Sequence, residues 1–131
     1  MASIHKRVEI NLPLNQAWAA LRQVAKAHEL FAPVLVDAKL DGDMRTVTFA
    51  NGMVAHERIV DVDEDKRRVA YSATDVPGMT YHHASMQLFD AGSGRTEFVW
   101  ITDFLPAGMA EKITPLIEQG TMALKANLES R

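Results

Sequence analysis

The sequence predicts one α+β domain, in which a curved antiparallel sheet of seven strands surrounds a long C-terminal helix and two short helices follow the first strand. Three observations support this prediction. Most of the chain alternates apolar and polar residues with the period of two that is typical of strands. Short turns rich in glycine, asparagine and aspartate separate these segments, so consecutive strands run antiparallel. The final apolar pattern has helical spacing, and only this segment is long enough to cover one face of the sheet.

The first elements along the chain are a strand and two short helices. Residues 4–11 alternate apolar and polar side chains, which predicts a strand with one apolar face. Pro13 suits the first position of a helix, and apolar residues follow it at helical spacing as far as Val24. Residues 27–31 predict a second helical turn, which ends before Pro33 because a residue that precedes proline avoids the helical conformation.

Six strands joined by tight turns come next. Asn51-Gly52 is the strongest short signal of a hairpin turn in the chain, and Asp41-Gly42 marks another turn. The predicted strands are residues 34–40, 45–50, 53–62, 67–74, 81–90 and 95–105.

The helical pattern returns after Pro106 for about 22 residues, or roughly 33 Å of helix. Pro115 lies inside this run and predicts either a kink or a new helix start, with Thr114 as the cap. The apolar stripe of the helix consists of Ile113, Leu116, Ile117, Gly120, Leu124 and Leu128.

Composition narrows the class of protein. The 131 residues fit one domain, which we take as residues 1–131, and 47% hydrophobic with 24% charged residues is typical of folded domains. The net charge of -3, without clustered Lys and Arg, argues against a nucleic-acid partner. Because the chain has no cysteine, disulfides, thiolate nucleophiles and Cys-ligated metals are excluded.

No cofactor, metal or membrane insertion is expected. The chain contains no P-loop or dinucleotide fingerprint, and the adjacent His82 and His83 of one strand point to opposite faces and cannot chelate one metal. The N-terminal residues lack the apolar run of a signal peptide, and no segment reaches the roughly 18 apolar residues of a membrane helix. We therefore expect a cytoplasmic protein.

Five short segments, in this order along the chain, resemble the START-related (SRPBCC) superfamily, which includes polyketide cyclase/dehydrase-type proteins, the birch-pollen allergen family and plant abscisic-acid receptors. The segments are residues 12–18, 57–63, 68–71, 82–85 and 100–106. The resemblance covers nearly the whole chain. It implies a helix-grip fold with an internal cavity for lipids, hormones, polyketides or similar apolar molecules, and it specifies no activity because such folds host many functions.

Strand parity and this resemblance together indicate which residues face the cavity. We expect Glu57 to face Tyr71, and Ile59 to face Val69, across the hairpin that follows residue 62. In the last strand we favour the face of Phe98 and Trp100 as the inner one, although a bulge would reverse it. The predicted ligand-binding residues are Ala55, Glu57, Ile59, Val69, Tyr71, Ala73, His82, Ala84, Met86, Phe98, Trp100, Leu116, Gly120 and Leu124.

Glu57 is the most informative of these residues. A carboxylate on an inward face needs a partner or must take up a proton, because its burial as a lone charge is unfavourable. The candidate partners are Tyr71 and His82, and the three side chains are candidate catalytic residues for general acid–base work on a bound polyketide or enol. The same three side chains equally suit hydrogen bonding to a ligand without chemistry.

The sequence therefore favours a protein that binds a small apolar ligand between sheet and helix. The alternative is a polyketide cyclase or dehydratase in which Glu57 and His82 act as acid and base. Ordinary core packing competes with a cavity role for the inward aromatic and aliphatic residues. A monomer and a homodimer are both compatible with these functions.

Overall fold

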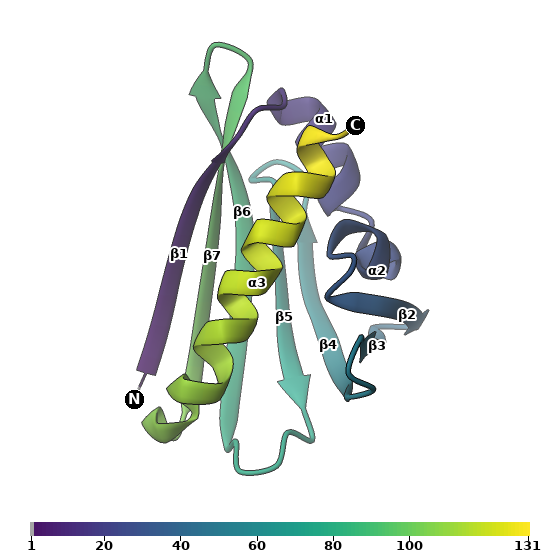
Figure 1. Cartoon of the computed structure of the whole chain (residues 1–131), viewed down its shortest axis with the longest axis vertical. Coiled ribbons are helices and arrows are strands. Elements are labelled where there is room, and N and C mark those ends of the chain that lie inside the picture. Colours follow the sequence, from purple (N-terminus) through teal and green to yellow (C-terminus); the bar gives the residue numbers. More distant parts are fainter. Residues whose placement is uncertain (1) are drawn as a thin grey trace.

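Seven antiparallel strands form one curved sheet in the computed structural model, which describes residues 2–131 (Figure 1). The strands are β1 (Ala2–Ile10), β2 (Leu35–Asp41), β3 (Met44–Phe49), β4 (Val54–Asp63), β5 (Arg68–Thr74), β6 (Tyr81–Gly92) and β7 (Arg95–Leu105). Their order across the sheet is β1-β7-β6-β5-β4-β3-β2, so β1 closes the edge beside the last strand. The predicted seven-stranded antiparallel sheet is confirmed.

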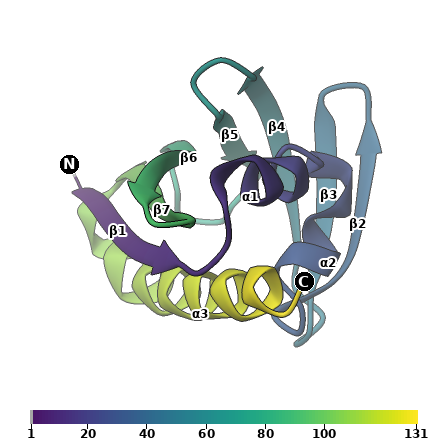
Figure 2. The ribbon, with the colours of Figure 1, turned by 90° about the horizontal axis from the view of Figure 1, so that it is seen from above.

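The long helix α3 (Ala110–Glu129) crosses the concave side of this sheet, and two short helices, α1 (Leu14–Leu21) and α2 (Ala27–Leu30), lie at one end of it (Figure 2). Of the two outcomes predicted at Pro115, the new helix start is wrong, because α3 is one continuous helix. Proline removes only one helical hydrogen bond here. The neighbouring Ile113 and Ile117 are buried in the core, and this packing holds the helix together across the proline.

The inward face of β7 carries the aromatic residues, as expected. Phe98, Trp100 and Phe104 are at most 7% exposed and belong to the core, together with Leu124 and Leu128 of α3. No helix within residues 2–131 is both long and apolar enough to cross a bilayer.

The predicted register of the β4–β5 hairpin is wrong. Glu57 pairs with Ala73, and Ile59 pairs with Tyr71, so the strands are displaced by two residues from the predicted pairing. The turn causes the difference: Asp63 pairs with Arg68, which displaces the pairing by three residues at the hairpin end, and Arg67 in this turn has a positive φ of 52°. The bulge between Ile59 and Asp61 then reduces the displacement to two residues. Because the displacement is an even number of residues, Glu57 and Tyr71 still share the inner face.

Candidate functional site

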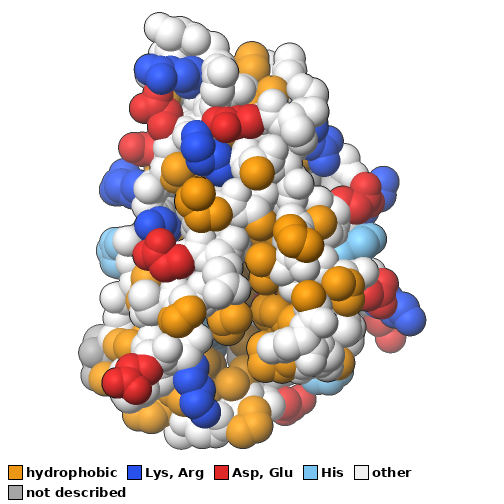
Figure 3. Space-filling model, in the orientation of Figure 1, with side chains coloured by type: hydrophobic (Ala, Val, Ile, Leu, Met, Phe, Trp, Pro, Cys, Tyr) orange, Lys and Arg blue, Asp and Glu red, His pale blue; other side chains and the backbone are white. Residues whose placement is uncertain are grey.

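A cavity of about 430 Å³ lies between the first half of α3 and strands β3 to β7. The inward faces of the strands and the apolar side of α3 supply mostly hydrophobic walls. The space-filling view shows a hollow lined with hydrophobic side chains at the end of the molecule where α3 begins (Figure 3). Cavities of roughly 300–1,000 Å³ with apolar walls and few polar groups are typical of small-molecule sites.

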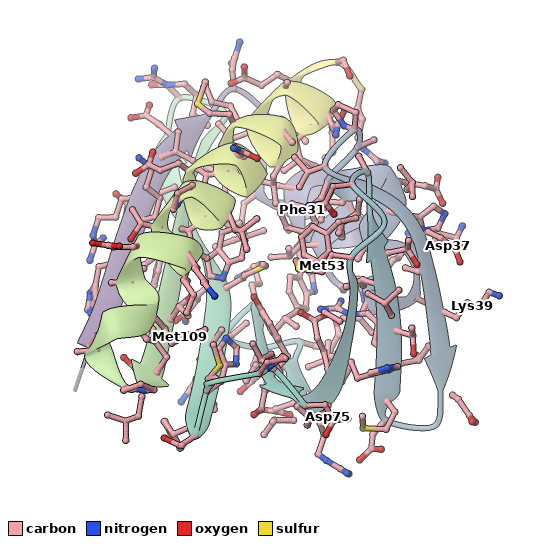
Figure 4. The ribbon with its side chains drawn as sticks, turned by 60° about the horizontal axis from the view of Figure 1, so that its bottom comes forward. Phe31, Asp37, Lys39, Met53, Asp75 and Met109 are labelled. Atoms are coloured by element: carbon pink, nitrogen blue, oxygen red, sulfur yellow. The ribbon has the colours of Figure 1, made fainter. Side chains whose placement is uncertain are left out.

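Apolar side chains surround the mouth of the cavity. Phe31 and Met53 lie together on one side of the opening, and Met109 lies across from them at the start of α3 (Figure 4). Asp75, in the loop after β5, and the exposed Lys112 of α3 are charged residues at this end. Met53 is 44% exposed, so part of the rim is apolar surface open to water.

The structure brings nine of the predicted ligand-binding residues into the cavity wall: Ala55, Glu57, Tyr71, Ala73, His82, Met86, Trp100, Leu116 and Gly120. It places five others outside this wall: Ile59, Val69, Ala84, Phe98 and Leu124. Four of these five are at most 3% exposed and fill the core, and Ile59 packs against that core. Strand parity identifies the inner face, but it cannot tell which part of that face is covered by other side chains.

Arg45 of β3 is the partner of Glu57. Its Nη2 and Nε lie 2.8 Å and 2.9 Å from Glu57 Oε1, and the two residues are paired across β3 and β4. Nη1 of Arg45 donates to the carbonyl oxygen of Val24 at 3.1 Å. The side chains of Arg45 and Glu57 are 8% and 14% exposed, so the ion pair is largely buried. Neither expected partner, Tyr71 or His82, bonds to Glu57.

Sequence reasoning missed Arg45, although a signal was available. Arg45 lies two and four residues before Val47 and Phe49, so all three share the inward face of β3. An arginine and a glutamate opposite each other on inward faces of paired strands satisfy each other's charge.

Tyr71 and Trp100 form the deep wall of the cavity. The indole Nε1 of Trp100 donates a hydrogen bond to the Tyr71 hydroxyl at 3.2 Å, and the guanidinium of Arg45 lies 5.4 Å from the centre of the Tyr71 ring. Burial raises the pKa of the Tyr71 hydroxyl, and the Glu57 carboxylate raises this pKa further. Tyr71 is therefore an uncharged phenol at neutral pH.

Gly120 allows Trp100 to lie against α3. A Cβ atom at Gly120 would be only 3.0 Å from the Trp100 ring, closer than most Cβ contacts, so the ring would have to shift to admit it. The Phe31 ring also packs against Trp100, with its centre 5.7 Å from that of Trp100 and its plane tilted by 45°. The close approach at Gly120 is thus made by an aromatic side chain of the cavity wall.

His82 lies where strands β5 and β6 separate. The ladder between β5 and β6 ends at the pair Tyr71 and Ala84, beyond which the two strands lose their backbone pairing. There the backbone N–H of Ala73 donates to Nδ1 of His82 at 2.8 Å, and the Ser72 hydroxyl donates to the His82 carbonyl oxygen at 2.6 Å. Since Nδ1 accepts, the ring proton is on Nε2. Burial lowers the pKa of His82 to about 4, helped by the neighbouring His83, so the ring is uncharged at neutral pH.

No group of three or more potential metal ligands of the His, Cys, Asp or Glu type occurs in residues 2–131. The polar groups of the cavity are instead an ion pair, a phenol, an imidazole and hydroxyl groups. They can donate and accept hydrogen bonds to a bound molecule.

Comparison with solved structures defines the class of fold. XoxI from Bacillus cereus is similar with a TM-score of 0.88 at 20% identity, covering 98% of this chain and 96% of that one. Norcoclaurine synthase from Thalictrum flavum, in complex with dopamine and hydroxybenzaldehyde, has a TM-score of 0.75 at 19% identity, covering 98% and 84%. The di-domain ARO/CYC protein BexL has a TM-score of 0.84 at 12% identity, covering 98% of this chain and 47% of BexL. The chain therefore has the helix-grip fold.

Sequence comparison then defines the family. The model of the family described as polyketide cyclase / dehydrase and lipid transport matches residues 1–129, and the chain belongs to this family. A search of curated proteins finds no match to the sequence.

Proposed function

We propose that this protein binds a small, largely apolar molecule in the cavity between α3 and the sheet. The observation that carries the proposal is the cavity of about 430 Å³, which has apolar walls although the rest of the concave side is closely filled. Exposed apolar surface is unfavourable, and a bound apolar molecule removes it from water. The family's description, which includes lipid transport, supports the same function.

The cyclase or dehydratase alternative receives less support from the geometry. Glu57 is held by Arg45, and Nδ1 of His82 is held by the Ala73 N–H, so each proposed acid or base already has a structural partner. A general acid or base must reach the proton that it transfers. We therefore assign Glu57 and His82 to the structure of the cavity wall rather than to proton transfer.

Native mass spectrometry after incubation with a lipid and polyketide extract tests the binding proposal. Wild-type protein is expected to retain bound species of small-molecule mass. Ala55→Trp places an indole in the cavity wall and should abolish retention, whereas Ala126→Trp on the exposed side of α3 should not. Equal retention by the wild type and Ala55→Trp, or no retention by any of the three proteins, would contradict the proposal.

A further inference from the structure

Thr102 presents a buried hydroxyl without a hydrogen-bond partner in the cavity wall. It lies on the inward face of β7, two residues after Trp100, and is 1% exposed. Its Oγ1 has no partner among residues 2–131. Buried polar atoms in native proteins almost always have a partner, so this exception requires an explanation.

The other two buried threonines, unlike Thr102, have hydrogen-bond partners. Thr96, on the same face of β7, donates to the Leu12 carbonyl oxygen at 2.7 Å, and Thr121 donates to the Ile117 carbonyl oxygen at 2.7 Å. Both are fully buried, and neither lines the cavity. Among the described residues, the buried threonine without a partner is the one in the cavity wall.

Tyr71 offers a second unused group on the same stretch of sheet. Ala84 of β6 pairs with Tyr71 on one side and with Thr102 on the other, so the two side chains flank it on the concave face. The indole of Trp100 can only donate, and the Tyr71 oxygen accepts that bond. The phenol proton of Tyr71 has no acceptor among residues 2–131 and is available to a ligand.

The charges at this depth are already balanced. Nε of the Arg45 guanidinium donates to Glu57, Nη1 donates to the Val24 carbonyl oxygen, and Nη2 lies 2.8 Å from the Glu57 carboxylate, so the charge of Arg45 is already paired. His82 is uncharged, and Lys112 lies in the exposed part of the wall, at the mouth. A carboxylate placed near Thr102 would lose its water and gain no counter-ion.

We propose that the ligand is an uncharged oxygenated molecule, a ketone, enol or phenol, whose oxygen bonds to Thr102 and Tyr71 at the deep end of the cavity. A carbonyl oxygen accepts from both hydroxyls, and a phenol accepts from Tyr71 while it donates to Thr102. The apolar remainder of the ligand contacts the hydrophobic walls between this oxygen and the mouth of the cavity. This inference rests on the proposed binding function and names the class of molecule that it serves.

Displacement of the uncharged dye Nile red by three probes of similar shape tests the inference. Naphthalene has no oxygen, 2-naphthol has an uncharged one, and 2-naphthoate carries a carboxylate at pH 7. We expect the wild type to bind 2-naphthol about fivefold more tightly than naphthalene, which corresponds to one net hydrogen bond. We expect 2-naphthoate to be the weakest of the three, by about tenfold or more relative to 2-naphthol.

Two variants identify the residues that recognise the oxygen. Thr102→Val keeps the shape of the side chain and removes its hydroxyl, so the preference for 2-naphthol over naphthalene should disappear. Tyr71→Phe should reduce it in the same way. Thr96→Val removes a buried hydroxyl of the same strand outside the cavity, and it should retain the preference of the wild type.

The outcomes separate this inference from the proposed function. Equal binding of naphthalene and 2-naphthol, an unchanged preference in Thr102→Val, or tightest binding of 2-naphthoate would overturn the oxygen site while apolar binding stands. Failure of Nile red and all three probes to bind would overturn the proposed function itself.

Discussion

The two ends of the concave side differ in how completely they are filled. At the end where α3 finishes, Ile10, Phe98, Leu124 and Leu128 are completely buried, and Asn127 ties the helix to the carbonyl oxygen of Leu30 at 2.8 Å. At the end where α3 begins, the wall of the cavity includes partly exposed side chains such as Leu116 and Met79. We call these the packed end and the open end.

This difference shows how the fold combines stability with a cavity. α3 crosses the sheet diagonally and meets α2 near its C-terminal end (Figure 1). The short helices therefore gather toward the packed end, whereas the first half of α3 faces the wide part of the sheet at the open end. Close packing at one end supplies the burial that folding requires, and it leaves the other end free to accept a ligand.

The largest expected effect comes from the buried ion pair in the cavity wall. Arg45→Met leaves the Glu57 carboxylate buried without a partner and should lower the free energy of unfolding by about 3 kcal/mol or more. Urea denaturation measures this change. The double variant Arg45→Met/Glu57→Leu should recover most of the loss, because no lone charge remains. A double variant that is as unstable as the single one would contradict this account of the pair.

Substitution of two leucines of α3, one at each end, compares directly how much each end contributes to stability. Leu124→Ala at the packed end should cost about 3 kcal/mol, because the side chain is fully buried and its removal leaves a hole. Leu116→Ala at the open end should cost about 1 kcal/mol or less, because the leucine already borders a cavity. Equal losses in urea denaturation would contradict the distinction between the ends.

A pH effect is expected from His82, whose pKa in the folded protein is lowered to about 4 by burial. Protonation then favours the unfolded chain, in which the histidine pKa is ordinary. The neutral, buried His82 therefore contributes to the free energy of unfolding above the ordinary histidine pKa near 6.5. This contribution, on the order of 2 kcal/mol, is lost as the pH falls toward 4. His83 and Asp103 are the neighbouring titratable groups, and they lower and raise this pKa respectively.

Urea denaturation between pH 7 and pH 4 measures this effect in the wild type and in His82→Gln. The glutamine offers an acceptor to the Ala73 N–H but does not titrate in this range. The stability of the variant should fall less steeply with decreasing pH than that of the wild type. Parallel pH profiles for the two proteins would show that His82 is not the source of the effect.

The smallest expected effect distinguishes the two buried threonines of β7. Thr96→Val leaves the Leu12 carbonyl oxygen without its partner and should cost about 1 kcal/mol. Thr102→Val removes a hydroxyl that has no partner within residues 2–131, so it should leave stability unchanged or raise it slightly. Thermal unfolding in the absence of ligand measures both, and a loss in Thr102→Val equal to that in Thr96→Val would contradict the account of this hydroxyl.

The strands were predictable from sequence because their signals are local. Alternation and turns such as Asn51-Gly52 placed β3 and β4 within about two residues of their bounds, as is usual for sequence-based element boundaries. The pairing of β1 with β7 was not predictable, since it joins segments that are far apart in the chain and no turn connects them. The bulge beside Val60 left no signal either, and the turn after Asp63 lies later in the chain than predicted, so Glu57 pairs with Ala73 rather than with Tyr71.

The candidate site was predictable only in part, for a related reason. The period of two assigns Phe98 and Trp100 to the same inner face, but only the three-dimensional arrangement puts Phe98 in the core and Trp100 in the cavity wall. Arg45 was missed because an isolated arginine in a strand is normally taken as a surface residue. The unpaired hydroxyl of Thr102 depends on the positions of atoms in neighbouring strands, which no local pattern contains.

Methionine methyl groups offer the most direct test of the central claim, that a ligand enters the open end. Met53, Met79, Met86 and Met109 line the cavity, whereas Met44 and Met122 lie outside it. In NMR spectra of methyl-labelled protein, saturation with 2-naphthol is predicted to shift the signals of the four cavity methionines and to leave those of Met44 and Met122 in place. Shifts confined to the exposed Met122, or no shift of Met86 at saturation, would contradict the claim.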